Sequence, residues 1–382
     1  MRNRLPLFFI TTSLFWFALY AYVPFVAPYA EELQADVRLI GLIAGSYGFV
    51  QMIIRFPLGI MSDISRRRKA FIIAGLIFAS VSGILVFMLP SPMILLAARS
   101  FAGAAASSWV VFTVLGASYN KPNDTVGSVG LLSAYSSGGR LLALLLGGIV
   151  AETVGIPYAF LLASVVGFIG LLLGFGVKEN RPEATVPPKL STLLDVARDR
   201  QLLFTSLLAI LAQYISWATT FGFTPLVAQQ LNATNFQLGM FGVVATLPGL
   251  IISPFVGKLL NKFGAKTVLS LSFAVMAAAC FAMPYCIAVW QLFAVQLINN
   301  IGLVVLATCL MGLCIKGISG ERRATAMGFF QAVYGLGMFL GPLVTGVSIH
   351  AFGMGASLVL VGAVGIIGAI FSIVCCYKKY IS

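Results

Sequence analysis

Charged residues are scarce in this sequence of 382 residues and make up only 9% of it. A soluble protein of ordinary composition carries about 25%. Acidic residues are scarcest: eleven Asp and Glu stand against 24 Lys and Arg, and there is a single histidine. These deficits exclude an ordinary soluble domain. They also leave few groups from which an acid–base catalytic site could be assembled.

Metal-ligand and nucleotide-binding patterns are missing as well. The six cysteines have no CxxC…CxxC spacing. Cys309 and Cys314 are five residues apart, or about 140° round a helix, so they do not share a face. No phosphate-binding loop is present. We therefore expect no metal, no cofactor and no enzymatic activity.

Long apolar runs take the place of these missing features, since 60% of the residues are hydrophobic. Each run is about 20 residues long, enough to cross ~30 Å of hydrocarbon. The sequence predicts an all-α membrane protein with twelve transmembrane helices, at roughly 6–29, 38–61, 70–89, 93–116, 127–150, 157–177, 203–227, 238–260, 267–288, 291–315, 324–348 and 355–376. One long polar segment interrupts the series. It predicts two six-helix bundles, at 1–177 and 203–382, joined by a cytoplasmic linker at 178–202.

The net charge of +13 is distributed unevenly. Of the 24 Lys and Arg, 20 fall in one alternating set of loops and termini, and the opposite set holds only Arg38. Positive charge of this kind marks the cytoplasmic side. We expect a multi-pass protein of the cell (plasma or inner) membrane with both termini in the cytoplasm, and no nucleic-acid partner.

The chain contains an internal repeat with an offset of 198 residues. The segment Gly130–Gly148, GLLSAYSSGGRLLALLLGG, aligns with Gly328–Gly346, GFFQAVYGLGMFLGPLVTG. The second copy has Met338 where the first has Arg140. Parallel repeats of six spans are a transporter architecture, with the binding site near the bilayer midplane between the halves.

Here the residues resemble the major facilitator superfamily. After the second span that family has Gly-x-x-x-Asp-Arg-x-Gly-Arg-Arg, and Gly59, Asp63, Arg67 and Arg68 match it, while Ile64 and Arg66 depart from it. The resemblance covers essentially the whole chain. It implies that this loop stabilises one conformation by pairing Asp63 with basic residues and helix ends. The alternative is that the arginines only set orientation and contact lipid phosphate.

Two further motifs carry the resemblance. Arg99 matches the fourth-span pattern Arg-x-x-x-Gly, whose arginine is associated with proton transfer in exporters of the family; the alternative is snorkelling to the outer surface. The fifth span resembles the antiporter motif in its glycine spacing but lacks the central Gly-Pro. The resemblance implies that helix sliding involves the small residues and proline of spans five and eleven, namely Gly139, Gly147, Gly337, Gly341 and Pro342.

Arg140 lies about 13 residues into its span, ~20 Å from the cytoplasmic side. A cation there costs ~3 kcal/mol or more unless it faces a cavity or a partner. None of the acidic residues lies in the central part of a predicted span, so no protein anion is evident unless Glu152 or Glu31 reaches inward. We hypothesise that Arg140 contacts a substrate anion. The alternative is structural hydrogen bonding to Ser136, Ser137 or backbone carbonyls.

Other polar residues fall on predicted spans. The tenth span carries Gln296, Asn299 and Asn300, with Gln296 and Asn300 on one face. Spans one and seven line the cavity in the family, and here they carry Tyr20, Gln213, Tyr214 and Trp217. Each of these residues is as compatible with helix packing as with ligand contact.

These observations predict a secondary active transporter that works by alternating access and resembles the drug or metabolite antiporter branch. We expect proton-coupled efflux of a small organic solute, with the arginines favouring an anionic or neutral one. An organic-anion importer or exchanger is the alternative, and a non-transporting membrane receptor is the alternative from another class. The expected partners of this monomer are its substrate, a proton or counter-anion, and membrane lipid.

Overall fold

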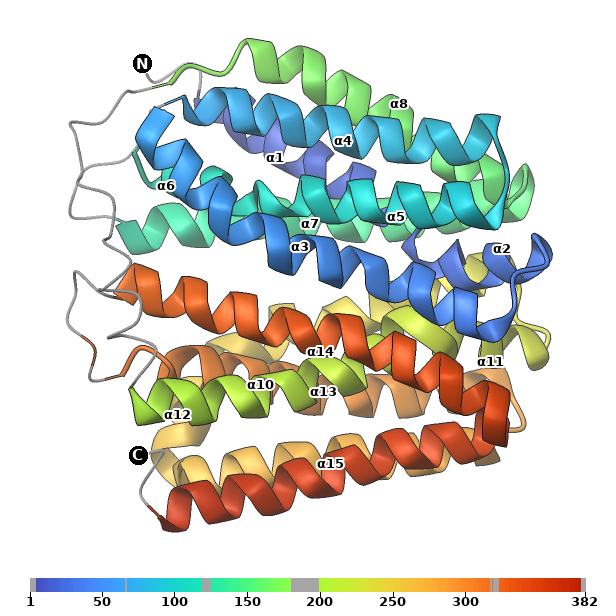
Figure 1. Ribbon diagram of the computed structural model, residues 1–382, viewed down its shortest axis with the longest axis vertical. Helices are drawn as coiled ribbons and strands as arrows, with labels where there is room; N and C mark the ends of the chain where they lie inside the picture. The colour runs from blue at the N-terminus through green and yellow to red at the C-terminus, as the bar shows by residue number, and fades with distance from the viewer. Residues whose placement is uncertain are drawn as a thin grey trace. The chain divides into compact units, whose positions relative to one another are not determined.

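The computed structural model describes residues 5–65, 67–118, 125–179, 199–316, 318 and 323–378, which are helical almost throughout (Figure 1). Helices are expected because hydrocarbon offers backbone N–H and C=O groups no other partner. In the described residues, eleven helical stretches are long and apolar enough to cross a membrane. The longest is interrupted by Gly264, whose φ of 76° is not helical. That break brings the number of spans to the predicted twelve.

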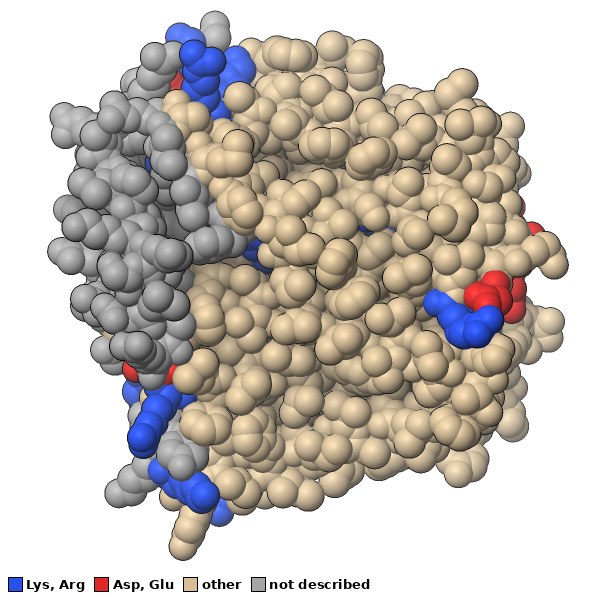
Figure 2. Space-filling view, viewed as in Figure 1, with Lys and Arg blue, Asp and Glu red and all other residues tan. Residues whose placement is uncertain are grey.

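The described chain forms two compact units. Unit 1 comprises residues 1–34, 50–187 and 234–243, and unit 2 comprises residues 35–49, 188–233 and 244–382. The predicted division at 177 and 203 stays a prediction, and most of the predicted linker lies outside the described residues. In Figure 2 the Lys and Arg side chains gather at the ends of the helices, and the broad surface between them carries almost none.

Unit 1 contains the helices of the first repeat. They are α1 (Leu5–Tyr20), the 3-10 turn η2 (Val23–Phe25), α2 (Val26–Glu32), the second part of α3 (Val37–Ser65), α4 (Arg68–Met88), α5 (Pro92–Ser107), α6 (Trp109–Ser118), α7 (Thr125–Thr153) and α8 (Ile156–Phe175). The first span is therefore α1, η2 and α2 in succession. The fourth span is α5 followed by α6.

Unit 2 contains most of the second repeat. Its elements are α10 (Arg200–Ala218), the π-helical segment η3 (Thr219–Phe223), α11 (Thr224–Gln230), most of α12 (Asn235–Ala282), η4 (Met283–Tyr285), α13 (Val289–Leu313), α14 (Arg323–Phe352) and α15 (Met354–Tyr377). The π-helix widens the backbone in the middle of the seventh span. Such segments are rare, and they are frequent at functional sites.

The repeat is visible in the backbone as well as in the sequence. Among the residues that the structure describes, two non-glycine residues have positive φ, Gln34 at 64° and Asn232 at 58°, and they are 198 residues apart. Gly155 and Gly353, at 119° and 82°, precede α8 and α15 and have the same offset. Residues with positive φ therefore stand at equivalent places in both halves. One pair follows α2 and α11, and the other precedes α8 and α15.

Glycines allow the helices within each unit to pack backbone to backbone. A methyl group built on Gly139 of α7 would overlap the carbonyl of Ser13 on α1, and one built on Gly147 would overlap that of Ala21, directly after α1. One built on Gly337 or Gly341 of α14 would meet the backbone of α10 in the same way. Close approach of this kind replaces the hydrophobic effect as the driving force between helices in lipid.

Glycines also lie where α3 and α12 begin. In unit 2, a methyl group on Gly41 of α3 would be 3.2 Å from the Cα of Gly346 on α14. In unit 1, one on Gly239 of α12 would be 2.8 Å from the Cα of Gly148 on α7. Gly41 corresponds to Gly239, and Gly148 to Gly346, through the offset of 198. The two crossings are therefore copies of each other.

Candidate functional site

Arg140 lies on α7 and is half-buried in unit 1. Its guanidinium carbon is 5.1 Å from the centroid of the Trp16 ring and 5.6 Å from that of Tyr20, both on α1. Its Nη2 donates to the hydroxyl of Ser137 at 3.1 Å. Stacking over aromatic faces attracts a cation, and the attraction grows when water is excluded. The α1–α7 packing created by Gly139 and Gly147 holds these groups together.

Aromatic rings extend from Arg140 toward the fourth span. Trp16 meets Trp109 of α6 edge to face, with 5.1 Å between ring centroids. Trp109 is followed by Phe112 at 6.2 Å, and Phe112 contacts Phe15 at 4.8 Å. This aromatic wall, Trp16, Tyr20, Trp109 and Phe112, is rigid because each ring is held by its neighbours.

The structure provides Arg140 with no protein anion within the part of the chain it describes. Asp36 forms an exposed ion pair with Arg38 at 2.9 Å, at the start of α3. Glu152 accepts a hydrogen bond from the backbone of Phe236 at 3.1 Å, and Glu31 is exposed. The buried Nε of Arg140 has no hydrogen-bond partner among the described residues. Donor capacity therefore remains on a guanidinium that could bind carboxylate or phosphate.

Three other arginines of unit 1 are buried, namely Arg55, Arg99 and Arg68, the last at the start of α4. Arg99 on α5 is 2% exposed, so it does not snorkel to the surface. Arg55 on α3 is 7% exposed.

The amides of the tenth span meet the π-helix of the seventh span in unit 2. The side-chain nitrogens of Gln296 and Asn300 both donate to the hydroxyl of Thr220, the second at 3.5 Å. Asn299 donates to Thr219 at 3.2 Å. Gln296 and Asn300, which were predicted to share one face of the helix, therefore both contact the same threonine.

This amide cluster retains unused acceptors. The side-chain oxygens of Gln296 and Asn299 are buried and accept no hydrogen bond from the described residues. Buried polar atoms without partners are rare in proteins. The cluster is therefore equipped to accept a hydrogen bond from a solute or from water.

The other predicted site residues are distributed in different ways. Tyr20 joins Arg140, whereas Trp217 is buried between the rings of Tyr47 at 5.1 Å and Phe221 at 4.9 Å. Gln213 and Tyr214 lie half-buried on α10, beside α14. Sequence reasoning did not select Trp16, Trp109, Thr219 or Thr220. Trp16 stands one helical turn before Tyr20, and that spacing could have identified it.

The residues predicted to take part in conformational change lie on α3, α4, α7 and α14. Arg67 precedes α4 and is exposed, and Arg68 is buried at its start. Gly59 has room beside it, since an added methyl group would be 4.0 Å from Val110. The side chain of Asp63 lies outside the described part of the structure. Pro342 lies within α14, and its carbonyl faces Gly41 of α3.

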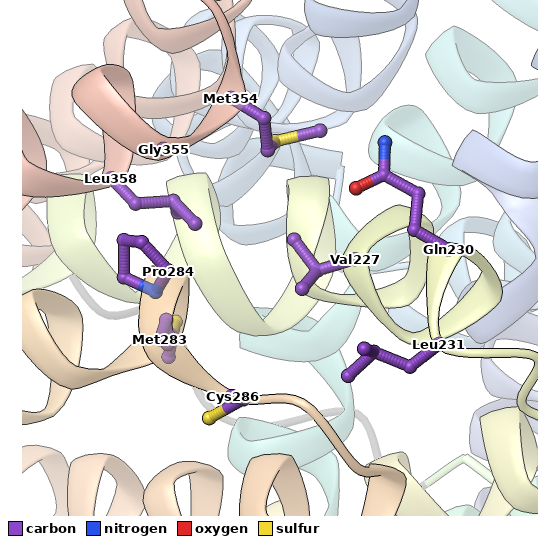
Figure 3. Close-up of a pocket in the computed structure, with 9 residues that line it drawn as sticks. All are labelled: Val227, Gln230, Leu231, Met283, Pro284, Cys286, Met354, Gly355 and Leu358. Carbon is purple, nitrogen blue, oxygen red and sulfur yellow. The ribbon is translucent and has the colours of Figure 1, made fainter.

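A small cavity of about 130 Å³ lies elsewhere in unit 2, between α11, η4 and α15. Its lining includes three sulfur-containing residues, Met283, Cys286 and Met354. Figure 3 shows the sulfur atoms of Met354 and Cys286 on opposite sides of it, so they do not converge on one point. Burial raises the pKa of the Cys286 thiol, which disfavours the thiolate that metals bind. Ligand pockets are larger, roughly 300–1,000 Å³.

Comparison with known proteins places the chain in a family. The family model described as Major Facilitator Superfamily matches residues 8–215 and 206–379, so the chain belongs to that superfamily. It is a multi-pass membrane transporter and not an enzyme. An uncharacterized MFS-type transporter of Methanocaldococcus jannaschii is 25% identical over 92% of this chain and 90% of that protein. The multidrug resistance protein MdtG of Dickeya zeae is 24% identical over 64% of this chain and 62% of that protein.

Solved structures show the same fold. A bacterial homolog of the human lysosomal transporter Spinster, in an inward-facing and unoccupied conformation, matches with a TM-score of 0.83 and 14% identity. The match covers 100% of this chain and 98% of that one. The nucleoside transporter NupG matches with a TM-score of 0.78 and 15% identity, covering 98% of each. Both predictions, the superfamily and the all-helical fold, are confirmed.

Proposed function

We propose that this transporter moves a small organic anion across the membrane by alternating access, and that Arg140 contacts the anionic group. The observation that carries the proposal is the position of Arg140, deep in its span, with a free Nε and no carboxylate among the described residues around it. A guanidinium so placed is stabilised by Trp16 and Tyr20 and still has donors to offer. Binding of a carboxylate or phosphate would compensate the charge.

The aromatic wall beside Arg140 restricts the rest of the substrate. Trp16 stacks on Arg140 and contacts the half-buried Trp109, so apolar rings lie directly beside the one cation. Solute pockets combine a mostly apolar lining with a few polar groups that fix orientation. This combination favours an amphipathic solute with a flat apolar body and one anionic group. A neutral polar solute is the second possibility, favoured by the unused amide oxygens of Gln296 and Asn299.

We propose efflux coupled to protons as the form of transport, with import or exchange of organic anions as the alternative. The name of the MdtG relatives supports efflux. Arginine cannot give up its proton in a protein, so Arg140 can carry an anion but not a proton. No acidic residue stands in the central part of a span. Proton coupling would therefore depend on a proton carried by the substrate itself, whereas exchange needs only that one anion replace another at Arg140.

Orientation is part of the proposal. The distribution of Lys and Arg supports both termini, and the segment 178–202, lying on the cytoplasmic side of the cell membrane. Reporter domains active on only one side of the membrane, fused to either end, would test it. Activity of an externally active reporter at either terminus would contradict this orientation.

The purified protein in proteoliposomes would test the transport proposal. A panel of anionic, neutral and cationic metabolites is first screened for thermal stabilisation, and solutes that stabilise are then loaded and followed with and without a pH gradient. We expect stabilisation by organic anions, and stimulation of their release by external anion under exchange or by the pH gradient under proton coupling. Stabilisation by cations alone would overturn the assignment of Arg140.

Substitution of Arg140 provides a second test of the transport proposal. Arg140→Ala and Arg140→Lys should both reduce transport strongly, because a lysine ammonium offers neither the bidentate geometry nor the planar stacking of guanidinium. Arg38→Ala is the matched control, since Arg38 is an exposed arginine of an outer turn. Undiminished transport by Arg140→Ala, at equal expression, would contradict the proposal. Binding without any flux in the wild-type protein would favour a receptor.

A further inference from the structure

An apolar groove of about 320 Å³ lies in unit 2 between the second part of α12 and α13. Its lining comprises Leu259, Phe263, Thr267, Val268, Leu271, Ser272, Val275, Ile301, Gly302 and Val305. Leu271 and Phe263 remain 60% and 52% exposed, so the groove is open to the surroundings. The groove has no part in the site around Arg140, which belongs to unit 1.

The floor and one end of the groove are set by glycines. A methyl group on Gly302 of α13 would be 2.9 Å from the Ser272 carbonyl and 2.9 Å from Met276 on α12, so the helices nearly touch there. Gly264, with its positive φ, turns the chain between Phe263 and Thr267. Phe263 and Thr267, which lie on either side of this turn, therefore both line the same end of the groove.

Two lysines, Lys262 and Lys266, lie at this end of the groove. The ammonium of Lys262 is 5.3 Å from the ring centroid of Phe263, a lining residue. Lys266 is exposed and directly precedes Thr267, another lining residue whose side chain is exposed. An apolar channel thus ends beside two positive charges and a hydroxyl. A phospholipid has the complementary arrangement, because its acyl chain is apolar and its headgroup can carry negative charge.

Charge complementarity identifies the class of lipid. From Arg200 to the end of the chain there are nine Lys and Arg and one acidic residue, Glu321. Zwitterionic lipid would gain little from such a surface, whereas an anionic headgroup gains about 1 kcal/mol for each nearby basic residue. Basic pockets between transmembrane helices on the cytoplasmic side bind such headgroups.

We propose that this groove is a binding site for one anionic phospholipid, with an acyl chain along α12 and α13 and the phosphate at Lys262 and Lys266. The site is selective for headgroup charge, which distinguishes it from the general lipid contact of a membrane surface. It is independent of the transported substrate. The proposed cytoplasmic orientation places the lipid in the inner leaflet.

The test measures lipid bound to the purified full chain in mild detergent. Phosphatidylglycerol and phosphatidylcholine are titrated separately, and lipid-bound species are counted by native mass spectrometry, with the thermal midpoint as a second readout. We expect one tightly bound phosphatidylglycerol and no equivalent binding of phosphatidylcholine. Equal binding of both lipids would overturn the proposal. A second copy of the chain in place of lipid, seen as a dimer mass, would also overturn it.

Variants separate the site from general surface charge. Lys262→Gln with Lys266→Gln should weaken phosphatidylglycerol binding about 30-fold, the sum of two basic contacts. Arg38→Gln with Arg200→Gln removes the same charge from exposed positions that neither line the groove nor adjoin a lining residue, and should change the affinity by less than about threefold. Equal losses in the two double variants would contradict a defined site.

A third variant blocks the groove and leaves the lysines in place. Thr267→Trp puts a large ring at an exposed lining position, so folding should be preserved. We expect it to lose the tightly bound lipid while its net charge is unchanged. Retention of wild-type lipid selectivity would mean that the acyl chain does not lie in the groove.

Discussion

The two halves of this transporter share a backbone and differ in the chemistry they place on it. In the first half a cation, Arg140, lies against aromatic rings. Its counterpart in the second half is Met338, which is 5% exposed. In the second half the polar groups are neutral amides at positions 296, 299 and 300, whose counterparts 98, 101 and 102 are Ala, Phe and Ala. One half is suited to hold a charge, and the other to form neutral hydrogen bonds.

The difference is possible because glycine contacts bring the helices of each half together at positions other than those of these polar groups. Gly139 and Gly147 bring α7 onto α1, and Gly337 and Gly341 bring α14 onto α10. With the backbone fixed in this way, side chains that face the interior could diverge without loss of the fold. Exchanging equivalent residues between the halves is therefore the direct way to test which differences matter.

The largest effect is expected from placing the charge in the wrong half. Met338→Arg puts a guanidinium where a buried Met now packs, and should destabilise the protein by about 3 kcal/mol or prevent its accumulation. The thermal midpoint in detergent measures the loss, and Met338→Leu is the control of nearly conserved volume. A midpoint like that of the wild type would mean that the second half also tolerates a cation.

The reciprocal exchange tests the charged half. Arg140→Met should reduce transport of an organic anion by roughly 10- to 100-fold, since charge-assisted hydrogen bonds contribute about 1.5–3 kcal/mol. Stability should be unchanged or increased, because the buried cation is removed. Initial rates in proteoliposomes, together with the thermal midpoint, separate the two effects. Loss of stability in parallel with transport would indicate a structural role for the Ser137 hydrogen bond.

The amide cluster offers a matched pair of smaller changes. Thr220→Val removes the hydroxyl that accepts from Gln296 and Asn300, and should cost about 1 kcal/mol of stability. Tyr22 occupies the equivalent position in the first half and makes one hydrogen bond, with Ser82 at 3.2 Å. Tyr22→Phe should therefore cost less than Thr220→Val. The opposite order of thermal midpoints would show that the cluster is not held by Thr220.

The smallest effect is expected at the caps of α3 and α12. Asp36 accepts from the backbone of Leu39 at 2.8 Å, and its counterpart Thr234 accepts from Gln237 at 3.3 Å. The backbone hydrogen bond from Leu39, followed by that from Arg38, lowers the pKa of Asp36 below its usual value. Its contribution to stability is thus present at neutral pH and is lost as the pH falls below about 4. Asp36→Asn should abolish that pH dependence, whereas Thr234→Asn should leave it intact.

Much of the architecture could be predicted from the sequence, because hydrocarbon imposes a simple pattern. The twelve spans followed from the length of the apolar runs, and the offset of 198 residues from the glycines. The break of the seventh span at Thr219–Phe223 could not be predicted, since a π-helix has no clear local signature. The neighbours of Arg140 were equally hidden. Trp109 comes from a different span, and only the packing of three helices brings it to Trp16.

The aromatic wall has a practical consequence for spectroscopy. The chain has four tryptophans, and two of them, Trp16 and Trp109, lie at the arginine. Trp217 and Trp290 belong to the other unit. Replacing these two with Phe would leave an intrinsic fluorophore pair confined to the proposed substrate site. Emission from that pair would then follow occupancy of a solute whose identity is not known in advance, without any attached dye.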